Sequence, residues 1–497
     1  MTSGPLASPS LLAEVAASAL GADVLPGQPG PTLARVLRPD FGRWQAHTAR
    51  ARGCTRPVKL RGHSTTINPR TGEVIESFDT AALPDAVLYK PCGTRRESVC
   101  PACAEVYRWD AYHLIAAGLR GGKGVPDTVT THPATFLTLT PPSFGLVHTR
   151  PDRSGQPGTG HRRLGPCRPR RDHPSCAHGR PQSCGVVHGD GDARTGTPLC
   201  LDCYDHPGQV AWNAFVPKLW TRTIDAVKRE LARLSRQHGG TPARLRYAKV
   251  AEFQARGAVH LHALLRLDGD DPDDPEAVLS PPSWATVELL NRLLVDAAAT
   301  TAIRTPSHPD QANGWLIQWG RQVRPLTVAH GLPGAEITEQ HVAGYLAKYA
   351  TKATEPAGHL STRLTHSTVR IYTDPARHTG RLIAAAWELG RPDAGPAWSR
   401  LRPWAHMLGF GGHFATKSRA YSTTFTALRI ARATAMRRAN AIAAQPEQLP
   451  PDDDSDTVLV VGTWTYAGTG WRTTADAALA LAAADAARSR RPAAVAA

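Results

Sequence analysis

Two histidines near the middle of the chain have the spacing of metal ligands. His260 and His262 are two residues apart in the segment 259–263, which alternates as a β-strand does. Side chains two apart on a strand project from the same face, so both imidazoles can reach one ion. Glu252 and Gln254, at the end of the preceding apolar segment, offer an oxygen as the third ligand. Mixed nitrogen and oxygen ligation suits Mg²⁺ or Mn²⁺, and zinc remains an alternative.

Two tyrosines further along the chain are candidate nucleophiles. Tyr345 and Tyr349 are four residues apart in a helix-like segment, which places them on one face, and Lys348 and Lys352 repeat that spacing. A phenol, with an ordinary pKa of about 10, attacks a phosphate at neutral pH only with help from nearby positive charge and a bound metal. An aromatic pair packed in a core would give the same pattern, and an exposed polar hairpin would give the histidine pattern.

Nine cysteines form a third set of candidate ligands, because two pairs have C-x2-C spacing. In a reducing compartment such thiols are typical of zinc sites and not of disulfides. We predict two structural zinc sites, with the ligands Cys54, Cys92, Cys100 and Cys103 in the first and Cys176, Cys184, Cys200 and Cys203 in the second. Cys167 is then left over, and His173, His178 and His188 lie nearby as further candidates.

Periodicity predicts the elements that position these residues. Strands are expected over 135–140, 245–253 and 259–267, and helices over 216–237, 284–299 and 336–352. The second and third strands form a hairpin, and a turn with an odd number of residues would place Glu252 and Gln254 on the histidine face. Thr338 is the expected cap of the last helix. The fold class is therefore α+β, with an antiparallel sheet flanked by helices.

Composition divides the chain into five expected segments. These are a loosely ordered N-terminal segment (1–50), a Cys-rich zinc-binding and helical segment (51–125), a central domain (126–360) with a Cys/His-rich zinc insertion (150–210), a basic helical DNA-binding region (361–449), and a small hairpin plus helix (450–497). The insertion lacks the apolar periodicity of a core, so metal would have to order it.

Charge favours a nucleic-acid partner. The chain has 58 Lys and Arg against 42 Asp and Glu, a formal charge of +16. Lys352, Lys417 and Arg419 are the expected DNA contacts. The first twenty residues lack a basic signal-peptide region and no run of eighteen apolar residues occurs, so we expect a cytoplasmic protein without membrane contact. The segment 121–124 lacks the Ser or Thr of a phosphate-binding loop, which argues against an ATPase or helicase domain.

The order of these features resembles the HUH endonucleases: a Thr-Leu-Thr strand, a His-x-His hairpin and a Tyr-x-x-Lys-Tyr helix. The last motif looks like the double-tyrosine motif of the gene A proteins of isometric single-stranded DNA phages. The segment 252–262 is similar to RepSA-type replication initiators of actinobacterial plasmids and integrative conjugative elements. That resemblance covers roughly residues 50–440 and includes Cys100-Pro-Ala-Cys103, Thr138-Leu-Thr140-Pro-Pro-Ser-Phe-Gly145, Leu199-Cys200-Leu-Asp-Cys203-Tyr204-Asp205 and Gly412-His413-Phe-Ala-Thr416-Lys417-Ser-Arg419.

The resemblance implies that residues 126–360 are an HUH nuclease domain that starts rolling-circle replication. His260 and His262 would bind the metal with Glu252 or Gln254, and Tyr345 would nick origin DNA, leaving a 5′ phosphotyrosine and a 3′ hydroxyl for a host polymerase. Tyr349 would be a second nucleophile or a packing residue, and a host helicase would unwind. The alternatives are an HUH relaxase or transposase, and a zinc-dependent DNA-binding regulator without catalysis.

Overall fold

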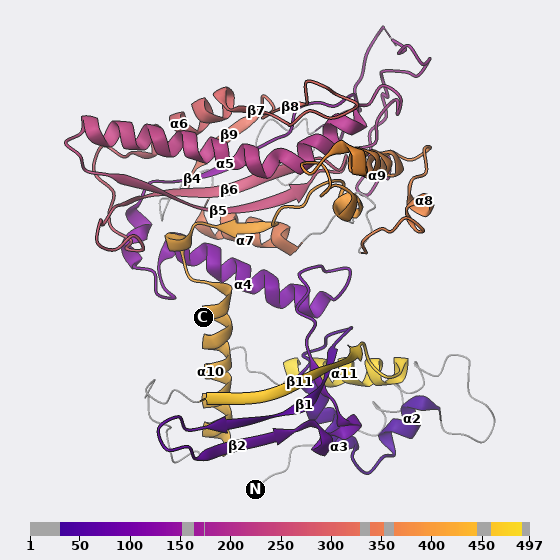
Figure 1. Ribbon diagram of the computed structural model, residues 1–497, viewed down its shortest axis with the longest axis vertical. Coiled ribbons are helices and arrows are strands. Elements are labelled where there is room, and N and C mark those ends of the chain that lie inside the picture. Colours follow the sequence, from indigo (N-terminus) through magenta and orange to yellow (C-terminus); the bar gives the residue numbers. More distant parts are fainter. Residues whose placement is uncertain are drawn as a thin grey trace. The chain divides into compact units, whose positions relative to one another are not determined.

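A computed structural model describes residues 30–151, 164–172, 174–328, 338–351, 362–444 and 459–489. The chain forms two compact units, one of residues 1–108 and 430–497 and one of residues 109–429 (Figure 1). The boundaries fall inside the helices α4 (Pro101–Arg120) and α10 (Phe425–Ala444). The described residues 30–108 and 459–489 therefore belong to one compact unit, although they were expected to lie in separate segments.

The terminal unit is built on a sheet of strand order β11-β1-β2, with β3 also paired to β1. Its elements are α2 (Pro31–Val36), α3 (Phe41–Ala49), β1 (Val58–Ile67), β2 (Val74–Asp79), η1 (Thr80–Ala82), η2 (Pro84–Ala86), β3 (Leu88–Lys90), β11 (Leu459–Thr469) and α11 (Thr474–Ser489). The expected C-terminal hairpin is wrong: β11 is one continuous strand, antiparallel to β1. Local alternation shows that a segment is a strand but not which strand it pairs with. The expected alanine-rich helix is confirmed as α11.

The central unit contains a five-stranded sheet of order β10-β5-β6-β4-β9, in which every neighbouring pair is antiparallel. Its elements are η3 (Asp127–Thr131), β4 (Ala134–Leu139), α5 (His206–Gln237), β5 (Ala243–Phe253), β6 (Val259–Gly269), α6 (Val287–Thr300), β7 (Ala302–Arg304), β8 (Leu316–Gln318), β9 (Val323–Thr327), α7 (Glu339–Thr351), α8 (Val369–Tyr372), α9 (His378–Leu389), η5 (Pro392–Ala394), η6 (Arg402–Met407), β10 (Ala415–Lys417) and η7 (Arg419–Tyr421). The sheet flanked by helices agrees with the expected α+β class.

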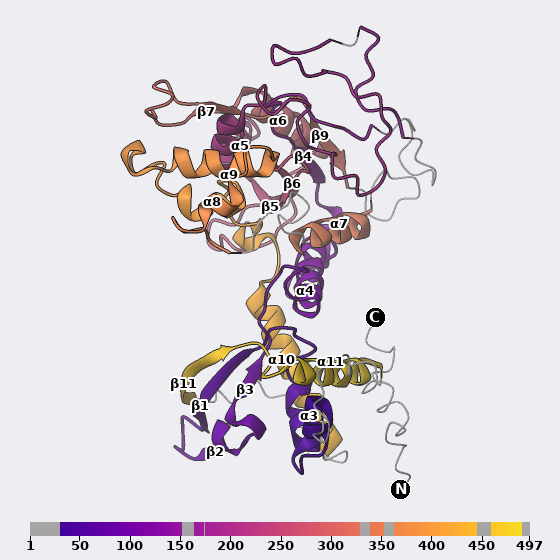
Figure 2. The ribbon, with the colours of Figure 1, turned by 90° about the vertical axis from the view of Figure 1, so that its right-hand side faces the viewer.

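The two faces of this sheet have different partners. The odd-numbered residues of β6, among them Leu261 and Leu265, are buried against α5 and α6, where Trp212, Leu219 and Leu294 complete the core. Figure 2 shows α5 and α6 on one side of the sheet and α7 on the other. The even-numbered residues, which include both candidate histidines, therefore lie on the face that α7 approaches.

Local chemistry explains the hairpin and the helix that carry the candidate site. The turn 254–258 is closed by hydrogen bonds from the Gln254 amide to the Ala258 carbonyl (2.9 Å) and from the Gly257 amide to the Gln254 carbonyl (2.8 Å). Gly257 has φ +77°, a left-handed conformation that favours glycine. Thr338 Oγ1 accepts a hydrogen bond from the His341 amide (3.3 Å), so the predicted cap is confirmed.

Both edge strands of the central sheet escaped prediction. Residues 361–449 were expected to be helical, but residues 415–417 within them form the strand β10, which pairs with β5. On the other edge, β9 contains Pro325, which sequence reasoning takes as a sign against a strand. An edge strand tolerates proline because one side of its backbone has no ladder partner. None of the helices in the described part of the chain has an apolar stretch long enough to cross a bilayer.

Candidate functional site

The hairpin of β5 and β6 brings the carboxylate of Glu252 close to the imidazoles of His260 and His262. Glu252 pairs directly with His260 across the strands. The Oε2 atom of Glu252 lies 2.8 Å from His260 Nε2 and 3.2 Å from His262 Nε2. These ligand atoms lie within 4.8 Å of one another, as the ligands of one ion do. Gln254, the alternative third ligand, instead has its Oε1 atom occupied by the Arg256 guanidinium (2.8 Å). Glu252 is therefore the residue placed to complete the set.

Strand β4 orients His262 from behind. Thr138 pairs with His262 in register, and its Oγ1 lies 3.0 Å from His262 Nδ1. A histidine that binds metal through Nε2 carries its hydrogen on Nδ1, and Thr138 is placed to accept that hydrogen. The Phe136 ring stacks on the imidazole with the planes 4° apart. Neither residue was singled out as a site residue from the sequence, although the Thr-Leu-Thr motif marked this strand.

Burial and hydrogen bonding set the charges that metal ligation needs. His262 is 2% exposed, and burial is the main cause of its lowered pKa. For Glu252, burial is the largest influence and raises the pKa, but hydrogen bonds from His260 and His262 outweigh it, so that the pKa falls below its ordinary value. At neutral pH the site therefore offers a carboxylate and a neutral imidazole at His262, the forms that bind a divalent cation.

Tyr345 reaches this site from α7. Its hydroxyl oxygen lies 3.4 Å from His262 Nε2, and its ring packs edge-on against His262 and Phe136. Tyr345 is 38% exposed, so part of the residue faces solvent. Lys348, one helical turn further on, is exposed. The side chain of Tyr349 and the whole of Lys352 lie outside the described residues.

Three further cations lie on or near this sheet. Arg324 on β9 pairs with Thr138 on β4, which in turn pairs with His262. Arg324 therefore lies on the same face of the sheet as His262, and it is exposed. Arg324 was not among the predicted site residues, because β9 was not predicted from the sequence. Lys417 was expected to contact DNA, but its Nζ donates to the carbonyls of Ser418, Arg419 and Ser422. Arg419 is exposed and forms an ion pair with Glu276.

The first predicted cysteine set is brought together. The sulfurs of Cys54, Cys92, Cys100 and Cys103 lie within 4.8 Å of one another. Backbone amides point at two of them: Thr55 donates to Cys100 (3.4 Å) and Cys92 donates to Cys54 (3.3 Å). A hydrogen bond from Cys103 is the main cause that lowers the pKa of Cys54 to about 5. Four clustered sulfurs, one of them a thiolate at neutral pH, fit a tetrahedral zinc ion.

The second predicted set is only partly correct. Cys176, Cys200 and Cys203 lie together, but the fourth member is His178, whose Nδ1 is 3.2 Å from Cys203 Sγ. A tight turn, closed by the Gly179 amide on the Cys176 carbonyl (2.9 Å), folds His178 back towards the cysteines. Cys184 belongs to another group of ligand atoms. These Cys/His clusters could hold structural zinc.

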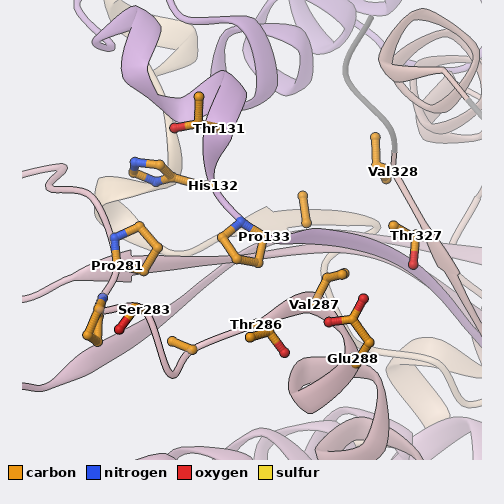
Figure 3. A pocket seen from close by; sticks show the side chains of 13 residues that line it. Thr131, His132, Pro133, Pro281, Ser283, Thr286, Val287, Glu288, Thr327 and Val328 are labelled. Carbon is orange, nitrogen blue, oxygen red and sulfur yellow. The ribbon is translucent and has the colours of Figure 1, made fainter. Parts of the chain in front are cut away.

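A cavity of about 440 Å³ lies at the other end of β4, where the strand begins (Figure 3). His132, Pro133, Thr286 and Glu288 are among its lining residues, and no predicted site residue belongs to the lining. The Nδ1 atom of His132 is tied to Asp268 (2.8 Å), which also binds Arg266. We place the candidate site at the face of the sheet next to α7, because the clustered ligand atoms of Glu252, His260 and His262 lie there with the Tyr345 hydroxyl beside them.

Comparison with known proteins identifies the class. A family model described as "RepSA: Replication initiator protein, pSAM2" matches residues 40–485. A replication initiator protein of Streptomyces ambofaciens is 42% identical over 453 residues, which are 88% of this chain and 90% of that protein. No solved structure matches the chain. The protein class is thus that of the replication initiators. Within that class, the chain belongs to the RepSA family.

Proposed function

We propose that this initiator nicks one strand of its origin DNA by attack of the Tyr345 hydroxyl on a phosphodiester, the chemistry of HUH endonucleases. One observation carries the proposal: the phenol oxygen lies 3.4 Å from His262 Nε2, in contact with a three-ligand cation site. The ring and the hydroxyl of Tyr345 thus lie directly against the imidazole that would bind the cation. Family membership supplies the origin as the DNA partner.

The residues present fit Mg²⁺ or Mn²⁺. Glu252, His260 and His262 would hold the cation, which when bound withdraws electron density from a phosphate oxygen. Thr138 fixes the orientation of His262, and Glu252 keeps both imidazoles turned towards the same point. Arg324 and Lys348 are both exposed, and they would neutralise phosphates next to the scissile bond.

Attack forms a bond between the Tyr345 oxygen and phosphorus as the bond from phosphorus to the 3′ oxygen breaks. The phenol gives up its proton and the departing 3′ oxygen takes one up, so the number of protons is unchanged. The products are a 5′ phosphotyrosine and a 3′ hydroxyl, from which a host polymerase extends while a host helicase unwinds. Because a phosphodiester is exchanged for a phosphodiester, the reaction is reversible and the strand can be rejoined. Tyr349, one turn along α7, is the proposed second nucleophile.

A labelled-strand experiment tests this proposal. Purified protein is incubated with single-stranded origin oligonucleotides carrying a label at either the 3′ or the 5′ end. The 3′-labelled strand should yield labelled protein that protease destroys, and the 5′-labelled strand should yield a shorter free oligonucleotide. EDTA should abolish both products, and Mg²⁺ or Mn²⁺ should restore them. If, with either metal present, the 3′-labelled strand yields no labelled protein and the 5′-labelled strand is not shortened, the proposal is excluded.

The hydrogen bond behind His262 gives a separate prediction. Thr138→Val removes the hydroxyl that accepts from Nδ1 while keeping the shape of the side chain. We expect the apparent affinity for Mn²⁺ in the nicking reaction to fall by about 10- to 100-fold, the usual effect of losing a group that orients a metal ligand. Thr138→Ser keeps the hydroxyl and should stay close to the parent protein. Equal Mn²⁺ dependence in both variants would show that Thr138 has no such role.

A further inference from the structure

Cys184 does not lie with its predicted set but in another group of four ligands, which was not predicted from the sequence. The group consists of His148, Cys167, Cys184 and His188, whose ligand atoms lie within 4.8 Å of one another. Cys184 Sγ is 3.6 Å from His188 Nε2, and His148 Nδ1 is 3.3 Å from the same nitrogen and 3.9 Å from Cys167 Sγ. We propose that this group binds a third structural zinc ion, separate from the two predicted zinc sites.

The surroundings of the group are those of a metal site. Cys167 and His188 are both fully buried. His188 Nδ1 lies 2.7 Å from Asp192 Oδ2, which leaves Nε2 free to bind metal, and Arg194 holds the same carboxylate in place. The Thr149 amide donates to Cys167 Sγ (3.2 Å), which favours a thiolate. Two sulfurs and two nitrogens in a closed cluster select zinc over harder divalent metals.

The distribution of all nine cysteines supports the assignment. Four lie in the first group, three lie with His178 and the remaining two are Cys167 and Cys184. Cys167 is therefore not a leftover packing residue. Between β4 and α5, the described residues form isolated bridges such as Val147↔Pro198 but no named strand or helix. A segment with so little regular structure gains its stability from bound metal.

The ion would also hold this segment against the hairpin of the candidate site. The His148 amide donates to the Thr197 carbonyl (2.8 Å), and the Gly196 amide donates to the His148 carbonyl (2.9 Å). Gly196 in turn abuts the hairpin turn: a Cβ atom there would lie 2.5 Å from the Ala255 carbonyl carbon and 2.7 Å from the Arg256 nitrogen. His148, a ligand of the proposed zinc, is thus hydrogen-bonded through its backbone to Gly196, which contacts the turn between Glu252 and His260.

Zinc counting in the full-length protein tests whether Cys184 and Cys203 serve separate ions. Cys184→Ala and Cys203→Ala should each lower the zinc content, measured by mass spectrometry of the metal, by one equivalent per chain. The double variant should lose two equivalents. A loss of only one in the double variant would mean that the two cysteines share a site, and no loss from Cys184→Ala would mean that the group binds no zinc. Either result overturns the proposal.

A conservative variant guards against loss of metal through misfolding. Cys184→His replaces a thiolate by an imidazole, which zinc also accepts, so it should keep the equivalent that Cys184→Ala loses. Thiol alkylation adds a second readout: Cys184 is only half-buried, so burial alone would not protect it. It should resist alkylation until a chelator removes the metal. Rapid alkylation of Cys184 in the zinc-loaded protein would contradict the assignment.

The contact with the turn has its own test in a matched pair of glycines. Gly196 and Gly191 both have positive φ, but a Cβ at Gly191 meets nothing within 4 Å. Gly196→Ala should therefore increase the rate of hydrogen exchange at the amides of the hairpin turn by several-fold, whereas Gly191→Ala, with similar backbone strain, should not. Equal exchange in the two variants would show that the segment does not support the turn.

Discussion

Tyr345→Phe is expected to lower the rate of covalent attachment to origin DNA by at least about 10⁴-fold, as loss of a nucleophile does in other covalent enzymes. Only the hydroxyl is removed, so the packing of the ring against His262 and Phe136 is kept. DNA affinity, measured by fluorescence anisotropy with an origin oligonucleotide, should stay unchanged. If the protein were a zinc-dependent regulator without catalysis, neither the parent protein nor Tyr345→Phe would form an adduct.

Tyr349→Phe is the matched control, since it removes the same atom one turn along the same helix. It should form the first covalent adduct at the normal rate. If Tyr349 is the second nucleophile, this variant should fail to cleave a second origin strand presented to the covalent complex. If Tyr345→Phe formed the adduct normally and Tyr349→Phe formed none, Tyr349 would be the first nucleophile and not Tyr345.

The parts of the site that could be predicted are those written in short-range patterns. His-x-His on an alternating strand fixes two side chains on one face, and the odd turn carries Glu252 onto that face. That Tyr345 packs against this face could not be derived from periodicity, because α7 lies 70 residues beyond the hairpin. It was expected only from the resemblance to a known arrangement. The hydrogen bond of Thr138 and the position of Arg324 depend on cross-strand register, which no local pattern encodes.

The zinc ligands and the terminal unit show the same limit. C-x2-C pairs predicted Cys100 with Cys103 and Cys200 with Cys203, but the partners of those pairs depend on how loops without periodicity fold back. Sequence distance therefore placed Cys184 in the wrong set. β11 is almost 400 residues from β1, and a long-range pairing of that kind leaves no trace in either segment alone.

Glu252→Ala is expected to have the second largest effect, because it removes the negatively charged member of the cation site. Loss of a group that only orients a ligand weakens metal binding by about 10- to 100-fold, so loss of the ligand itself should exceed about 100-fold. Nicking at limiting Mn²⁺ should fall accordingly and recover in part at high Mn²⁺. The titration of activity with Mn²⁺ gives the midpoint directly, and circular dichroism checks the fold.

Gln254→Ala separates the role of Glu252 as a ligand from a general sensitivity of the strand end. Gln254 lies two residues away, and its side-chain oxygen is held by Arg256 and not by the histidines. Its removal should leave the Mn²⁺ midpoint almost unchanged while Glu252→Ala shifts it. Were Gln254 the true third ligand, the order would invert. Comparing the Mn²⁺ midpoints of Glu252→Ala and Gln254→Ala therefore shows which of the two residues is the third ligand. The result does not depend on which tyrosine cleaves first.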